Sequence, residues 1–75
     1  MSADEQLLQV FQSVFGDGIE SLNDEDALDT VAGWDSAGHL TLVMAIEAEF
    51  GLQFDIAEIE HLTSVAAIRQ RLRDA

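Results

Sequence analysis

The chain has 75 residues with no Cys and no Pro, and 48% of its residues are hydrophobic. A chain of this size forms one domain with a small core, and without Cys it has neither disulfides nor thiolate metal sites. Its 15 acidic and 3 basic residues give a net charge of −12, which disfavours nucleic acid and anionic membranes as partners and favours a basic protein.

The first predicted element is an amphipathic helix over residues 3–15. Ser2 and Glu5 have the spacing of a capping box, in which Ser2 caps the helix and Glu5 bonds back to it. Apolar residues then recur at helical spacing until Gly16 and Gly18 end the pattern: Leu7, Leu8, Val10, Phe11, Val14 and Phe15. The acidic start does not resemble a secretory signal, and no apolar run is long enough to cross a bilayer, so we expect a cytoplasmic protein.

Residues 16–34 are predicted to form a long connection without regular structure. A loop of this length is unusual in a compact domain, so its scattered apolar residues should pack onto the core: Ile19, Leu22, Leu28, Val31 and Trp34. The acidic run at 24–26 could supply calcium ligands. It lacks the central Gly and the terminal Glu of an EF-hand loop, so we expect no metal site.

The second predicted helix opens at Asp35 or Ser36, runs to Phe50 and stops at Gly51. Its apolar residues fall on two faces, of which one must meet the core: Leu42, Val43, Ile46 and Phe50. The opposite face carries two large apolar residues among smaller or polar ones: Ala37, Leu40, Thr41, Met44, Glu47 and Ala48. Scattered surface hydrophobic residues are common, but an exposed Leu and Met rimmed by Glu also suit a docking surface, the interpretation we favour.

Two more helices complete the prediction. Residues 55–62 are expected to form a short helix capped by Asp55, with Glu58 in the reciprocal position of a capping box. A fourth helix follows Thr63 or Ser64 and ends on an arginine cluster, which suits a helix C-terminus; it covers Val65, Ala66, Ile68 and Leu72. No strand pattern competes. The predicted fold is an all-α bundle of three main helices and one short helix, with a long loop between the first and the second.

Ser36 stands at the start of the second helix, after an acidic loop. Free N–H groups and the helix dipole there favour a phosphate on or near its hydroxyl, although a Ser in this place more commonly serves only as a cap. A serine hydrolase is disfavoured, because no GxSxG elbow is present and nothing obvious orients the ring of His39. His39 and His61 are expected at helix surfaces or half buried, not as metal ligands.

The segment GWDS (33–36), followed by HLTLVMAIEAEFG (39–51), resembles the acyl carrier protein family. In that family an Asp-Ser-Leu motif opens the second helix, and its Ser carries 4′-phosphopantetheine. The TSV start of the last helix (63–65) is also similar, and the resemblance covers roughly residues 24–73. It implies a four-helix bundle of acyl-carrier-protein type, a single carrier domain over residues 1–75 and no enzymatic activity.

By this resemblance Ser36 is the attachment site, and Asp35 helps a phosphopantetheinyl transferase to orient it. The outer face of the second helix would bind partners through Ala37, Leu40, Thr41, Met44 and Glu47. Apolar residues would line a pocket for the tethered cargo: Leu42, Ile46, Phe54, Ile59 and Leu62. The partners would be the transferase and the loading and processing enzymes (an adenylating enzyme, an acyltransferase or a synthase). Basic patches on these enzymes would dock on the acidic carrier, which is expected to be a monomer.

Three residues depart from the family pattern. Ala37 stands where the family usually has Leu, and Thr41 and Ala48 occupy positions that are often acidic in fatty-acid carriers. These changes disfavour recognition by fatty-acid synthase enzymes. The Trp-Asp-Ser form resembles dedicated carriers of specialised biosynthetic pathways, whose cargo could be an amino acid, a glyceryl unit or another acyl group. An aminoacyl or peptidyl carrier is therefore an alternative. An acidic interaction module without a prosthetic group is a second alternative, from another class, and acidity that serves only solubility is equally open.

Overall fold

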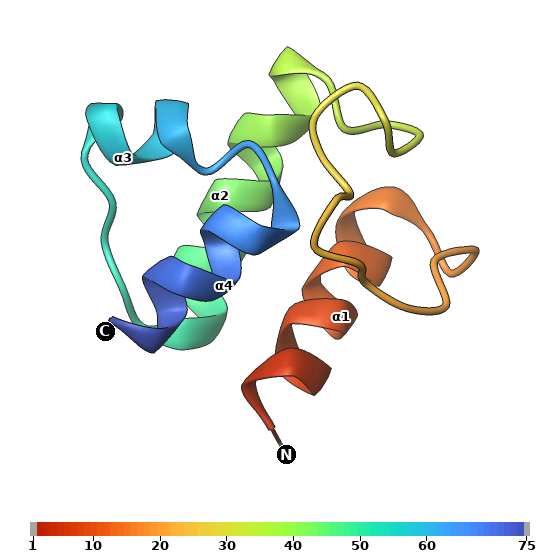
Figure 1. Ribbon diagram of the computed structural model, residues 1–75, viewed down its shortest axis with the longest axis horizontal. Helices are drawn as coiled ribbons and strands as arrows, with labels where there is room; N and C mark the ends of the chain where they lie inside the picture. Colours follow the sequence, from red (N-terminus) through yellow and green to blue (C-terminus); the bar gives the residue numbers. More distant parts are fainter. Residues whose placement is uncertain (1, 75) are drawn as a thin grey trace.

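The computed structural model describes residues 2–74, which contain four α-helices: α1 (Ala3–Phe15), α2 (Ser36–Phe50), α3 (Ile56–His61) and α4 (Val65–Arg73). The main helix pair is α1 with α2, and the short α3 lies beside α2 on the side away from the long loop (Figure 1). The all-α prediction is confirmed, and α3 is one residue shorter at each end than expected. No helix within residues 2–74 has the length and apolar character needed to cross a bilayer.

Side chains cap the helices where the sequence predicts caps. Ser2 Oγ accepts from the Glu5 N–H at 3.1 Å, and Asp55 Oδ1 accepts from the Glu58 N–H at 2.7 Å. At α4 the cap is Ser64, whose hydroxyl accepts from Ala67 at 3.1 Å. The reciprocal half of the predicted capping boxes is absent from the described chain: the Glu58 carboxylate instead accepts from Arg71 Nε at 3.2 Å. Each cap therefore satisfies one of the free N–H groups of its helix.

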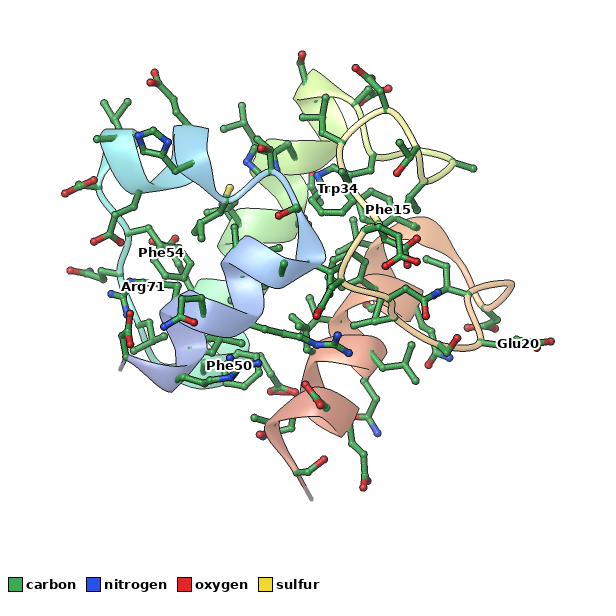
Figure 2. All side chains as sticks on the ribbon, viewed as in Figure 1. Phe15, Glu20, Trp34, Phe50, Phe54 and Arg71 are labelled. Atoms are coloured by element: carbon green, nitrogen blue, oxygen red, sulfur yellow. The ribbon has the colours of Figure 1, made fainter. Side chains whose placement is uncertain are left out.

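The core lies where the helices meet the end of the loop. Its fully buried side chains come from α1, α2, α4 and Trp34, which lies two residues before α2: Leu7, Phe11, Trp34, Leu42, Val43, Ile46, Val65 and Ile68. Trp34 packs edge-to-face on Phe11, with 5.3 Å between the ring centroids, and stacks on Phe15, with 6.1 Å between the centroids. Figure 2 labels Trp34 and Phe15. Phe50, predicted in the core stripe, is only half buried against it. Aromatic packing thus fixes the chain directly before α2.

The loop between α1 and α2 is held to the rest of the fold by backbone bonds. The Leu28 N–H donates to the Thr63 carbonyl at 2.9 Å, and the Val65 N–H donates to the Asp26 carbonyl at 2.8 Å. These bonds flank an isolated antiparallel bridge between Ala27 and Ser64. As predicted, its apolar residues pack against the core: Ile19, Leu22, Leu28 and Val31 half buried, and Trp34 buried. The loop is therefore an ordered part of the core and not a free linker.

Arg69 connects α4 to α1 and to the long loop. Its guanidinium donates to Asp24 Oδ1 at 2.6 Å, to Asp4 Oδ1 at 3.3 Å and to the Leu22 carbonyl at 3.2 Å. The hydrogen bond with Asp24 is the main cause that raises the pKa of Arg69 above its ordinary value. Asp24, one of the acids that suggested calcium, is thus paired with a cation, and Asp26 Oδ2 accepts from the Asn23 N–H. Here these acids hold the loop in place.

Salt should stabilise this domain. Raising NaCl from a few millimolar to about 0.2 M shortens the Debye length to below about 10 Å, which screens the self-repulsion of the net charge. The same salt weakens the ion pairs Arg69–Asp4, Arg69–Asp24 and Arg71–Glu58, but their carboxylate side chains are 69%, 63% and 38% exposed, so each contributes little. We expect Tm, followed by circular dichroism, to rise over this range. A Tm that stays flat or falls contradicts the expectation.

Candidate functional site

The first turn of α2 is shaped by Asp35. This residue is the N-cap, in extended conformation, and its Oδ1 accepts from the Gly38 N–H at 2.8 Å. Ser36 is therefore the first helical residue and does not cap the helix. The alternative in which Ser36 is only a cap is wrong, because the carboxylate beside it performs that task.

The Ser36 side chain is exposed, and its hydroxyl takes part in none of the hydrogen bonds of residues 2–74. The backbone N–H groups at the start of a helix lack helical acceptors, and here the Asp35 carboxylate occupies only that of Gly38. The next residues are Ala37 and Gly38, which are too small to crowd the hydroxyl. A phosphate ester on Ser36 would therefore find free donors, a favourable helix dipole and open space.

Behind this turn lies a buried polar pair that the sequence did not reveal. Trp34 is 1% exposed and His39 6% exposed, and Trp34 Nε1–H donates to His39 Nδ1 at 3.0 Å. The other ring nitrogen, Nε2, lies 2.8 Å from the Ile59 carbonyl oxygen. The expectation of a surface or half-buried His39 with no orienting partner is wrong; His61 is exposed, as expected.

The burial of His39 does not make Ser36 the nucleophile of a hydrolase. His39 is oriented, but both of its ring nitrogens are engaged inside the domain, whereas the Ser36 side chain is exposed to solvent. The ring is therefore not available to take the Ser36 hydroxyl proton, as a general base must be.

The outer face of α2 is apolar at its centre. Leu40 is 57% exposed and Met44 is 68% exposed, with Ala37 and Thr41 exposed beside them. Glu47 differs from the expectation of a free rim charge. It is half buried, and its Oε2 accepts from the Phe54 N–H at 2.8 Å, so it also fixes the chain between α2 and α3.

The five residues proposed to line a cargo pocket lie together in the core. Leu42 and Ile46 are fully buried, Phe54 and Leu62 nearly so, and Ile59 is half buried against them. Arg71 covers the Phe54 ring, with its guanidinium carbon 5.2 Å from the ring centroid (Figure 2). In the structure these side chains pack on their neighbours, so a cargo would have to part them to enter.

Comparison with protein families gives a match over most of the chain. The family described as the phosphopantetheine attachment site matches residues 5–72, which include all four helices in whole or in large part. The chain belongs to this family. Comparison with curated proteins and comparison with solved structures each gave no match.

Membership of the phosphopantetheine-attachment family fixes the class of function. Its domains carry a 4′-phosphopantetheine group and are carriers rather than enzymes, so this chain is a phosphopantetheine carrier. Carriers of this family act with a phosphopantetheinyl transferase and with synthases or acyltransferases. The four-helix arrangement agrees with a carrier fold of this family.

Two features around the turn at Ser36 were not predicted from the sequence. One is the pair formed by Trp34 and His39, and the other is the close approach of Gly38 to the carbonyl oxygen of Gly33. The glycines on either side of the Trp-Asp-Ser segment were a visible signal, since paired glycines often mark a close backbone contact. For His39 the signal was its place on the core stripe of α2, one turn before Leu42 and Val43, although the helical pattern could not show that its ring bonds to Trp34 and Ile59.

Proposed function

We propose that Ser36 carries the phosphopantetheine arm, and that residues 1–75 act as a single carrier domain that presents a substrate to partner enzymes of a specialised biosynthetic pathway. The observation that carries this proposal is the capping of α2 by Asp35, which leaves the Ser36 hydroxyl exposed and unbonded at the positive end of the helix. The bound arm supplies a terminal thiol that holds an acyl or related group as a thioester.

Ser36, Asp35 and the N–H groups of the first turn are the parts of this chain that meet the arm. A transferase would join Ser36 Oγ to the phosphate of the pantetheine arm of coenzyme A, displacing the nucleotide, while a base of the transferase takes the hydroxyl proton. Asp35 holds the turn closed through Gly38. Its carboxylate is exposed, so it would also give the transferase a charged group by which to orient the turn.

Attachment to a carrier raises the concentration of a substrate at each enzyme on which the carrier docks. The exposed Leu40 and Met44 would make the apolar contact in that docking. The net charge of −12 would steer the carrier toward basic patches on its partners.

Intact mass spectrometry tests the attachment. The protein is produced with and without a broad-specificity phosphopantetheinyl transferase, and we expect a single added phosphopantetheinyl mass, located by fragmentation to the peptide that contains Ser36. A parent that gains no mass would favour an acidic interaction module without a prosthetic group. Mass on another serine would contradict the site.

The cargo class is tested separately on the modified protein. Adenylating enzymes load amino or other carboxylic acids, whereas acyltransferases deliver acyl groups from coenzyme A. Loading by acyltransferases supports an acyl carrier. Loading only by adenylating enzymes specific for amino acids supports the alternative of an aminoacyl or peptidyl carrier.

The docking face gives a quantitative prediction. Replacing Leu40 and Met44 together by Gln keeps good helix formers and polar length but removes the apolar contact, so kcat/KM for modification by the transferase should fall about tenfold or more. Because both side chains are more than half exposed, the Tm should stay near that of the parent. Ala66→Gln, on the exposed side of α4, is the matched control. An unchanged kcat/KM in the double variant would show that the transferase does not use this face.

A further inference from the structure

His39 joins two parts of the carrier that are distant in the sequence. It lies one helical turn after Ser36, and its ring connects Trp34, just before the attachment turn, with the backbone of Ile59 in α3. Since Nδ1 accepts from the indole N–H, Nε2 must hold the ring proton and donate it to the Ile59 carbonyl oxygen. The ring also stacks on the indole at 6.1 Å, with 22° between the planes.

Few other contacts hold α3. This helix has six residues and no fully buried side chain, although Ile59 is half buried against the core. Among the side-chain hydrogen bonds of residues 2–74, two join it to other helices: His39 to Ile59 and Arg71 to Glu58. The Arg71–Glu58 pair is partly exposed, with the Glu58 side chain 38% accessible, and ion pairs of this kind contribute little. The bond from His39, whose ring is only 6% exposed, is therefore the better shielded of the two polar links.

We propose that His39 is a positioning residue that holds α3 in a fixed place relative to the Ser36 turn. α3 exposes Ile56 at 76%, and α2 exposes Leu40 and Met44. Because His39 joins the two helices that carry these side chains, it would hold Ile56 in a fixed position relative to Leu40 and Met44, on the surface that a docking enzyme meets. The docking step rests on the proposed function, whereas the link between α2 and α3 is a property of the unmodified protein.

Amide hydrogen exchange on the unmodified protein tests the link. The Ile59 and Leu62 amides, bonded to Asp55 and Glu58, report on α3, and the Phe11 and Ile46 amides report on the α1–α2 core. In His39→Leu, exchange at the α3 amides should accelerate about tenfold more than exchange at the core amides, because a local opening precedes global unfolding.

The conservative variant and the control sharpen this comparison. His39→Gln can place an amide N–H near the position of Nε2–H, so it should restore most of the α3 protection. His61→Gln changes the exposed histidine of the same helix and should leave exchange unchanged. Equal acceleration at all four amides, or identical behaviour of the Leu and Gln variants, would reduce His39 to a general contributor to stability and overturn the proposal.

If His39→Leu does not fold, a measurement on the parent protein still tests the hydrogen bond from His39 to Ile59. Nitrogen-15 spectra of the His39 ring should show the proton on Nε2, in slow exchange with solvent. A proton on Nδ1, or a freely exchanging Nε2 proton, overturns the proposal.

The kinetics of modification by the transferase test the positioning role of His39 separately from the attachment at Ser36. With the transferase, His39→Leu should raise KM about fivefold and leave kcat unchanged, and His39→Gln should be close to the parent. A change in kcat alone would contradict a positioning effect on docking. A parent that is never modified would refute the attachment at Ser36, while the exchange comparison would still test the α3 link.

Discussion

Ser36→Ala is expected to abolish phosphopantetheinylation and to leave the fold intact. The hydroxyl is the only atom lost, and it forms no hydrogen bond within the described chain, while Asp35 continues to cap α2. The free energy of unfolding should therefore change by less than about 0.5 kcal/mol, as for most exposed substitutions. Intact mass after exposure to the transferase should show no added group, and circular dichroism should show an unchanged helical spectrum.

Two further variants make this result specific. Ser21→Ala removes an exposed hydroxyl from the loop and should be modified like the parent. Asp35→Asn keeps an oxygen that can cap α2 but removes the charge, so its Tm should hold while modification slows if the carboxylate orients the transferase. A Ser36→Ala protein that still gains the mass would place the arm elsewhere and refute the assignment.

The four helices could be predicted because their signals are local. Caps such as Asp55 and Ser64 act within one turn, and the apolar periodicity of α1 depends only on which side chains share a face. The start of α2 was ambiguous between Asp35 and Ser36 for the same reason. Both residues make good caps, and only the backbone conformation shows which side chain reaches the Gly38 N–H.

The features that escaped prediction depend on contacts between distant segments. His39 lies on the core side of α2, but its burial requires Trp34 on one side and α3 on the other. Glu47 looked like a rim charge, because its bond to the Phe54 backbone exists only once the chain turns after α2. Arg69 likewise reaches Asp4 and Asp24 across the fold. Periodicity can place such a residue on a helix face, but it does not show which distant group the side chain will bond.

The same distinction between local and long-range signals applies to the outer face of α2 and to the residues proposed to contact cargo. Leu40 and Met44 could be placed outside from the helical wheel, and both are exposed as predicted. The wheel also places Leu42 and Ile46 inside, where they are fully buried. Contact with cargo would also require these buried side chains to move apart, and helical periodicity gives no information about such a movement.

Gly38→Ala is expected to destabilise the carrier strongly, although helix propensity alone predicts the opposite. Ala is favoured over Gly inside a helix by about 1 kcal/mol. A Cβ at Gly38, however, would overlap the carbonyl oxygen of Gly33 and lie 3.2 Å from Phe15 Cε1. That oxygen belongs to the backbone, and Gly33 is itself held at φ +88°, with Phe15 closely packed against it. Relief would require α2 to move away from the segment that precedes it.

We expect this overpacking to cost about 3 kcal/mol in the free energy of unfolding. A domain of this length has about 4–11 kcal/mol in total, so Tm should fall by many degrees. Gly18→Ala is the matched control, because its added Cβ meets no atom within 4 Å and its φ is not in the left-handed region. It should change stability by less than about 1 kcal/mol. If Gly38→Ala proves as stable as the parent or more so in urea denaturation, propensity outweighs the contact, and the turn that carries Ser36 does not require a glycine at its third residue.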